Sequence, residues 1–160
     1  MIKTLSVIVV TVLLVSFAFG ISIYDGMGML LNSYSNYPIP AINVGVQTNT
    51  TITGGINLYA LYPDVQQSML NQPIRNEWIV LVNVGLYQGN FALLLDGGLT
   101  TYNSFGYDSL YFFGLTTRYQ CQGSIFDPAI AFSMLWPFTM QNVYYPLMII
   151  SFENSINLGE

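Results

Sequence analysis

The chain begins with a long apolar stretch. No charged residue occurs from Leu5 to Tyr24, and apolar residues continue past Asp25 as far as Leu31. A helix rises about 1.5 Å per residue, so some twenty residues of this kind would cover roughly 30 Å, the hydrocarbon thickness of a bilayer. The pattern therefore predicts an apolar helix over residues 5–36.

Three interpretations of this segment remain open. It is typical of a secretory signal peptide, with Lys3 at the start, an apolar run over Leu5–Phe17 and a cut after Ala18-Phe19-Gly20. It also suits a permanent membrane anchor, or a helix that leaves the membrane and packs against copies of itself in a filament. Small residues at helical spacing favour the filament because they let helix backbones approach closely. These small residues are Ser16, Ala18, Gly20, Ser22 and Gly26.

After this segment the pattern changes to short apolar runs. Residues 37–40 contain two prolines and predict a linker. Residues 41–160 then alternate between apolar runs and turn signals, which predicts an all-β domain. Strands are expected at 41–48, 50–53, 56–62, 78–86, 90–95, 99–102, 110–119, 129–136 and 144–152. Turns are expected at Gly54-Gly55 and Asp96-Gly97-Gly98. This number of short strands indicates a β-sandwich or a closed sheet, and we expect the sandwich-like form.

The composition narrows the functional classes. Charged residues make up 7% of the chain, the net charge is −5, and only three residues are basic. Nucleic-acid binding depends on Lys and Arg near phosphates, so the composition argues against it. The single cysteine, Cys121, allows no intrachain disulfide, and we expect it to be a small buried apolar residue.

Candidate chemistry is sparse. The chain has no histidine, which removes the imidazole-based catalytic and metal sites. Asp96, Asp108 and Asp127 could gather round a cation, although turn-forming aspartates are commoner. Arg118 is expected to pair with a carboxylate for structural reasons. We expect no enzyme, cofactor or metal site. Asn49-Thr50-Thr51 is a sequon, so Asn49 is a candidate glycosylation site.

The layout resembles the archaeal type IV pilins, in which an apolar N-terminal helix carries a C-terminal β domain. The matching features are Lys3-Thr4, the Leu5-Ser6 start, the apolar helix and the switch to an Asn/Thr/Tyr-rich region after Pro38. The resemblance implies cleavage between Thr4 and Leu5, with residues 1–4 as a short leader. It further implies an extracellular filament at the cell surface, used for adhesion or surface contact. The subunit would sit in the cell membrane before assembly and would then have copies of itself as partners.

Two alternatives come from other classes. A Sec-secreted β protein with its mature start after Gly20 could use Ile21–Leu31 as a donor strand and form strand-exchange filaments. A membrane-anchored viral envelope or capsid protein would instead keep the N-terminal helix.

Overall fold

The described residues form eight antiparallel strands and no helix. The computed structural model describes residues 20–31, 38–48, 50–62, 77–100, 111–121, 126–139, 143 and 145–158. The strands are β1 (Ile21–Leu31), β2 (Ile39–Thr48), β3 (Ile52–Leu61), β4 (Glu77–Gln88), β5 (Phe91–Thr100), β6 (Tyr111–Gln120), β7 (Asp127–Phe138) and β8 (Leu147–Leu158).

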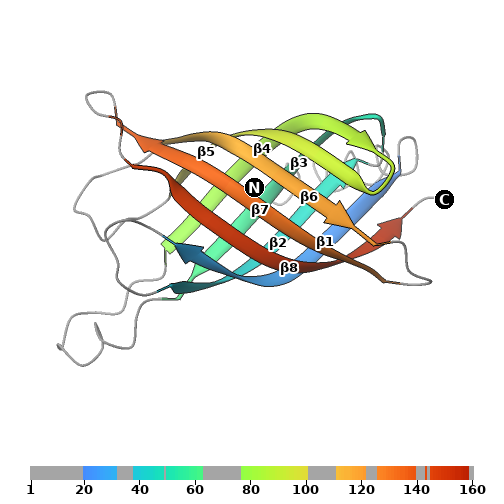
Figure 1. Ribbon diagram of the computed structural model, residues 1–160, viewed down its shortest axis with the longest axis horizontal. Helices are drawn as coiled ribbons and strands as arrows, with labels where there is room; N and C mark the ends of the chain where they lie inside the picture. Colours follow the sequence, from blue (N-terminus) through green and yellow to red (C-terminus); the bar gives the residue numbers. More distant parts are fainter. Residues whose placement is uncertain are drawn as a thin grey trace, which may run out of the picture.

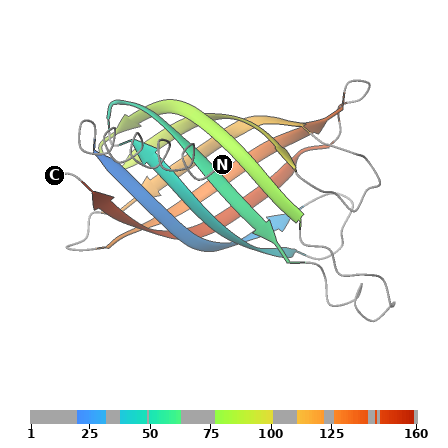
Figure 2. The same ribbon diagram turned by 180° about the vertical axis from the view of Figure 1, so that it is seen from behind.

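Each strand pairs with the next one along the chain, and the sheet closes on itself. β1 pairs with β8 from Ile21↔Leu158 to Leu31↔Met148, which completes a barrel in the order β1 to β8. The strands run obliquely along the barrel (Figure 1), and the same inclination is visible from behind (Figure 2). Closure leaves no sheet edge with unpaired backbone groups along these strands.

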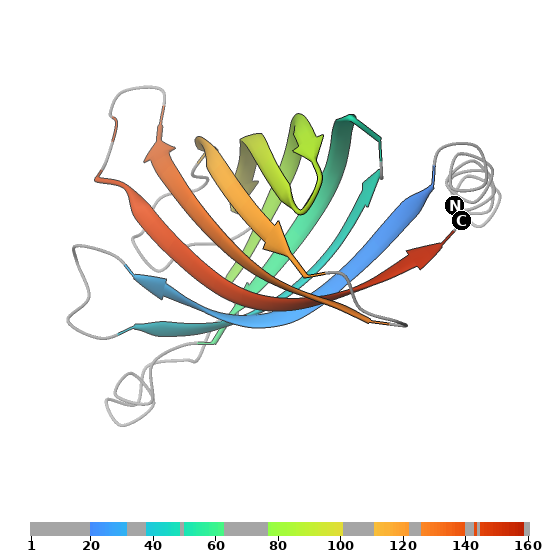
Figure 3. The same cartoon turned by 45° about the vertical axis from the view of Figure 1, so that its right-hand side comes forward.

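The two ends of the barrel differ in their connections. The start of β1 and the end of β8 lie side by side at what we call the proximal end (Figure 3). Residues 49–51, 89–90 and 121–126 connect strands at this end. At the opposite, distal end the connections are mostly longer, and they span residues 32–38, 62–76, 101–110 and 139–146.

Side chains alternate between the interior and the outer surface because successive residues of a strand point to opposite faces. The apolar part of the interior lies toward the distal end. It consists of Leu30, Ala41, Tyr59, Leu61, Ile79, Leu81, Phe112, Leu135, Leu147 and Ile149, with Ile39 packed against it.

The expected helix is wrong over its second half. Residues 21–31 form β1, and no helix within the described ranges has the length and apolar character needed to cross a bilayer. The reason lies in β1 itself, where Ile23, Met27 and Met29 point outward while Gly26 and Gly28 alternate with them. Because both faces of β1 carry apolar or small residues, its sequence looks like a continuation of the apolar run before it, and no boundary between the two segments is visible. Residues 1–19 lie outside the described part.

The sandwich-like arrangement is also wrong, because the sheet is a closed barrel that already begins at Ile21. Two of the expected turns lie inside strands. Gly97-Gly98 belongs to β5 and pairs with both neighbouring strands, while in β3 Gly55 pairs with both neighbours and Gly54 with β4. Of the expected linker at 37–40, Ile39 and Pro40 belong to β2.

These findings overturn the resemblance to type IV pilins and the filament function that followed from it. β1 is a wall of the barrel and therefore cannot serve as the core helix of a pilus. The strand-exchange alternative needed Ile21–Leu31 as a free donor strand, but β1 is paired on both sides within its own chain. The viral envelope alternative relied on a helical anchor and gains no support from the barrel.

Candidate functional site

The outer surface of the barrel is apolar along its whole length. On β4, for example, Val82 is 59% exposed and Val84 53% exposed, and both lie away from the interior. The other strands repeat this arrangement. Exposed aliphatic and sulfur-containing side chains include Ile23, Met27, Met29, Ile42, Val44, Val46, Ile52, Ile56, Leu86, Leu93, Leu95, Leu99, Leu115, Ile130, Ile150, Ile156 and Leu158.

Exposed aromatic side chains gather toward both ends of the barrel. Near the distal end they are Tyr62, Trp78, Tyr111, Phe113 and Tyr145. Near the proximal end they are Phe91, Tyr119 and Phe126. At the distal end the ring of Phe113 stacks on that of Trp136, with 5.5 Å between centroids. Between the two groups the exposed side chains are mostly aliphatic, but Phe132 and Phe152 are exposed there in the middle of β7 and β8.

A few polar side chains interrupt the apolar surface, among them Thr117 of β6 and Gln88 at the end of β4. Asp25 of β1 lies opposite Asn154 of β8, and both are exposed. Among the outward-facing side chains of the described strands, Asp25 is the single charged one. The outer surface therefore has almost no groups that prefer water.

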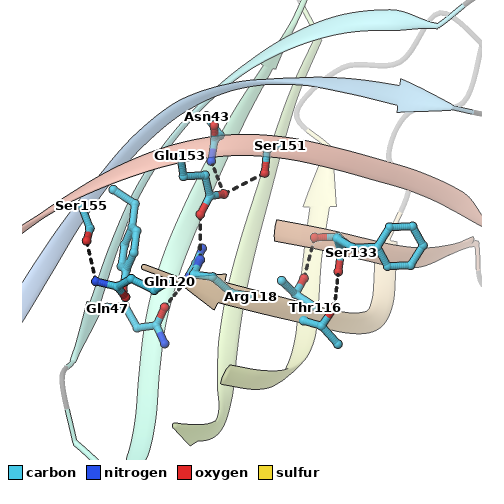
Figure 4. Close-up of polar contacts among 12 residues, drawn as sticks. Asn43, Gln47, Thr116, Arg118, Gln120, Ser133, Ser151, Glu153 and Ser155 are labelled. Carbon is cyan, nitrogen blue, oxygen red and sulfur yellow. Dashed lines mark hydrogen bonds and ion pairs between the residues drawn. The ribbon is translucent and has the colours of Figure 1, made fainter. Parts of the chain in front are cut away.

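The interior holds the opposite chemistry, built round a buried ion pair (Figure 4). Arg118 Nε donates to Glu153 Oε2 at 2.7 Å, and both side chains are fully buried. Arg118 Nη1 donates to Gln47 Oε1, and the guanidinium lies 4.1 Å from the centre of the Tyr24 ring. A charge is costly to bury unless it is paired and hydrogen-bonded, and contacts from three other strands meet this requirement at Nε and Nη1 of Arg118, whereas its Nη2 has no hydrogen-bond partner among the described residues.

The second oxygen of Glu153 is satisfied as well. Glu153 Oε1 accepts from Asn43 Nδ2 at 2.6 Å and from Ser151 Oγ at 2.8 Å. The carboxylate thus connects β8 to β2 and β6 across the barrel (Figure 4). Such a set of charge-assisted hydrogen bonds fixes the relative positions of the walls.

A second polar group lies beside this network, on β5, β6 and β7. Thr116 Oγ1 donates to Asp96 Oδ2 at 2.6 Å, so its single proton is used. The 2.6 Å contact between Thr116 and Ser133 must then have Ser133 Oγ as donor. The other oxygen of Asp96, Oδ1, has no hydrogen-bond partner although it is buried.

Three inward asparagines each lie over a glycine of the preceding strand. A methyl group at Gly26 would come within 2.7 Å of Asn43 Oδ1, and one at Gly55 within 3.1 Å of Asn83 Oδ1. Asn57 Oδ1 occupies the corresponding space over Gly45. At Gly26 and Gly55 a side chain would also meet the backbone of a neighbouring strand, at Phe152 O and Val46 O, each at 2.3 Å, so glycine is required there.

Polar side chains continue to the proximal end. Tyr24 and Tyr87 both donate to Gln120 Oε1, at 3.3 Å and 2.8 Å. Gln120 Nε2 donates in turn to Ser155 Oγ at 2.8 Å and to Asp127 Oδ2 at 3.1 Å. The interior is therefore occupied by bonded side chains from the middle of the barrel to its proximal end.

The sites expected from the sequence are distributed differently. Ser22 and Gly26 lie in β1, where Ser22 Oγ donates to Asn157, so the helix packing expected of them does not apply. Gly20 directly precedes β1 with a φ of 63°. The remaining expected positions, Thr4, Leu5, Ser16, Ala18 and Asn49, lie outside the described residues.

The carboxylate expectations can be compared directly. Asp96 lies in the interior beside Thr116, Asp127 lies at the proximal end and Asp108 is outside the described part, so no shared cation site of the three is seen. The described ranges contain no group of three or more His, Cys, Asp or Glu residues able to hold a metal. The expectation that Arg118 pairs with a carboxylate is confirmed. Cys121 is exposed, so its expected burial is wrong.

Sequence reasoning missed the interior partners Asn43, Gln47 and Glu153. The alternation in β2 and β8 could have identified them, because polar residues recur there at every second position between apolar ones. In the barrel the polar residues of this alternation face the interior and the apolar ones face outward.

Comparisons with known proteins add little to this description. No protein-family model matches the chain, and no curated protein matches it. A structure of the outer membrane protein Ail of Yersinia pestis, in a phospholipid bilayer nanodisc, is similar over 86% of this chain and 99% of the Ail chain. Its TM-score is 0.49 and its sequence identity 11%. A likeness of this degree establishes neither shared ancestry nor shared function.

Proposed function

We propose that the chain is an integral membrane β-barrel of the outer-membrane type. The observation that carries the proposal is the inverted polarity of the barrel, with apolar side chains outside and hydrogen-bonded polar and charged side chains inside. In water such a surface would be driven to associate, whereas in a bilayer the lipid chains cover it. A closed barrel also satisfies every strand's backbone groups internally, as the hydrocarbon region demands.

The dimensions and the aromatic groups support the same proposal. Strands of 10 to 12 residues match the roughly 9–11 residues that a tilted strand needs to cross a bilayer. Aromatic side chains concentrate at the two interfaces of membrane barrels, and here eight of the ten exposed aromatic side chains of the described residues lie toward the two ends, with Phe132 and Phe152 between them.

The connections support an orientation. Barrels of this type have short turns on the periplasmic side and longer loops on the extracellular side. We infer that the proximal end, with the connections 49–51 and 89–90, faces the periplasm. The distal connections, including 62–76 and 101–110, would then face outward.

The filled interior favours a closed barrel over an open pore. Arg118, Glu153 and their partners occupy the middle, while Leu81, Leu135 and the rest of the apolar cluster occupy the distal half. In eight-stranded barrels side chains are just large enough to fill the inside, and those described here do so. We therefore propose that the barrel functions within the membrane without transporting molecules through its interior.

Tryptophan fluorescence tests the proposal directly. The chain has two tryptophans, and Trp78 is 39% exposed on the outer surface while Trp136 stacks there on Phe113. The protein is refolded into vesicles whose phospholipids carry bromine at defined depths along the acyl chains. We expect strong quenching by lipids brominated near the headgroup and weaker quenching by those brominated near the bilayer centre.

A Trp78→Phe variant serves as the matched control, because it isolates the signal of Trp136. Acrylamide, a water-soluble quencher, should act weakly on both proteins. Efficient quenching by acrylamide together with no effect of the brominated lipids would show that the apolar surface does not contact lipid.

A further inference from the structure

The seam between β1 and β8, which lie side by side in Figure 1, carries two polar side chains on the outer surface. Asp25 points outward from β1, and Asn154 points outward from β8 directly opposite it. Asp25 is the fifth of the eleven residues of β1, so it lies inside the apolar band and not at its rim. Val44 of β2 lies beside Asp25, and Pro128 of β7 lies beside Asn154. The two side chains thus form a small polar patch with apolar neighbours on both sides.

The polar groups of this patch are not satisfied within the described part of the chain. Neither Asp25 nor Asn154 has a side-chain hydrogen bond to another described residue. A bond between the two would still leave one N–H and the oxygen of the Asn154 amide without partners. Hydrocarbon offers no hydrogen bonds, and ionisable side chains inside a membrane therefore face other protein groups or a water-filled cavity. On the outer surface of a barrel, this requirement indicates contact with another protein.

The apolar neighbours of the patch have the composition of an interface. Met27 and Phe152 form the next outward pair along the seam, toward the distal end. Met27 is 72% exposed, the largest fraction among the large apolar side chains of the described residues, and Phe152 is 66% exposed. Phe152 also lies in the middle of β8, away from the aromatic groups at the two ends. Methionine and aromatic residues are enriched at protein interfaces, so this pair supports a contact at the seam.

We propose that the barrel forms a symmetric dimer in the membrane, in which the β1–β8 seam packs against the same seam of a second copy of this chain. The proposal rests on the lipid-facing outer surface proposed above. Two copies with the same orientation in a bilayer are related by a twofold axis along the membrane normal. In such an interface residue i meets residue j of the other copy, and j meets i. An axis that passes between Asp25 and Asn154 therefore brings Asp25 to Asn154 of the partner subunit.

The four polar side chains then alternate round the axis. Each carboxyl group has the amide of its own chain on one side and the amide of the partner subunit on the other, while the two carboxyl groups lie on a diagonal. Each Asn154 donates one N–H to Asp25 within its chain and the second N–H across the interface. The same symmetry sets Met27 against Phe152 of the partner subunit. A different protein would need its own matching carboxyl and amide pair, whereas a second copy supplies that pair by symmetry.

Sedimentation equilibrium in density-matched detergent micelles measures the Kd of the dimer. We expect a reversible dimer for the wild-type protein. Asp25→Leu and Asn154→Leu should each raise the Kd about 10- to 100-fold, because each removes every hydrogen bond of the alternating set. Both variants replace a polar group by an apolar one on the outer surface, so the single barrel should still fold.

Thr117→Val is the matched control for this measurement. It removes an outward polar side chain of β6, away from the seam, and should leave the Kd unchanged. A dimer that keeps its wild-type Kd in both leucine variants would place the interface elsewhere and overturn the proposal. Native mass spectrometry of the same samples should give the mass of two chains. One chain with a bound phospholipid or with a different protein would also overturn it.

Pulsed electron paramagnetic resonance locates the interface in phospholipid vesicles. The exposed Cys121 is first replaced by serine, and a single spin label is then attached at Leu158→Cys or at Phe91→Cys. Leu158 lies at the proximal end of the seam, whereas Phe91 lies on β5, which is opposite β1 in the closed barrel. We expect a short distance between labels at Leu158→Cys and a much longer one at Phe91→Cys.

The outcomes separate the dimer from the membrane assignment. The reverse order of the two distances, or no coupling between labels at Leu158→Cys, would overturn the seam interface. If brominated lipids still quench the tryptophans of such a protein, the membrane barrel stands and only the dimer fails. If the brominated lipids have no effect, the membrane assignment fails as well.

Discussion

An arginine placed on the outer surface separates a lipid-facing barrel from a water-facing one. Val82 points outward in the middle of β4 and is 59% exposed. In water, a Val82→Arg substitution at such a position would change stability by about 0.5 kcal/mol or less. At the midplane of a bilayer the same change costs about 2–4 kcal/mol, which raises the unfolding constant about 30- to 700-fold.

Ile52 supplies the matched control because it points outward but lies at the proximal start of β3. It is 71% exposed, and near an interface an arginine costs only about 0–1 kcal/mol. Both variants are refolded into phospholipid vesicles and unfolded with guanidinium chloride, with tryptophan fluorescence as the signal. We expect Val82→Arg to lower the midpoint clearly and Ile52→Arg to lower it slightly. Equal midpoints for the two variants, both close to wild type, would refute the depth argument and the membrane assignment with it.

Four further outcomes follow from the structure. Glu153→Gln should destabilise the protein by about 3–5 kcal/mol in the same assay, because Arg118 is left buried without its counter-ion; an unchanged midpoint would mean that solvent reaches the pair. Gly26→Val should cost about 1–3 kcal/mol or prevent folding, since the added side chain meets the backbone of β8 and the amide of Asn43, whereas Gly97→Ala, with open space around it, should stay within about 0.5 kcal/mol. Planar-bilayer recordings should show no steady conductance, and a stable open pore would contradict the filled interior. If residues 1–20 act as the export signal, N-terminal sequencing of the protein purified from membranes should begin at Ile21, and a start at Met1 or Leu5 would exclude that cut.

The sequence predicted many strand positions but not the way the sheet closes. The expected strand at 41–48 corresponds to β2, and the strand at 78–86 lies within β4. Period-two alternation reveals such strands, but it does not say which face is buried. In β2 the apolar Ile42, Val44 and Val46 face outward, while Asn43 and Gln47 face the interior. The choice between core and lipid for the apolar face depends on the solvent, and the alternation is identical in both cases.

Closure and the polar interior depend on contacts distant in sequence. The pairing of β1 with β8 joins the first and last strands of the barrel, and no local sequence pattern predicts it. Arg118 was expected to pair with a carboxylate, but Glu153 could not be singled out because β7 lies between their strands in the sequence. The low charge content of the chain is consistent with an outer surface that carries a single described charge, at Asp25.

Closure also sets the order of events during synthesis and export. Ile21 and Leu158 meet at opposite ends of the described sequence, so no intermediate that lacks β8 can complete the barrel. Until that last strand arrives, β1 offers an open hydrogen-bonding edge and the chain exposes its apolar outer positions to water. Pairing across so long a separation is slow, since the loop entropy is lost before the contact forms. We therefore expect a chain truncated before residue 147 to leave the sheet open and to aggregate.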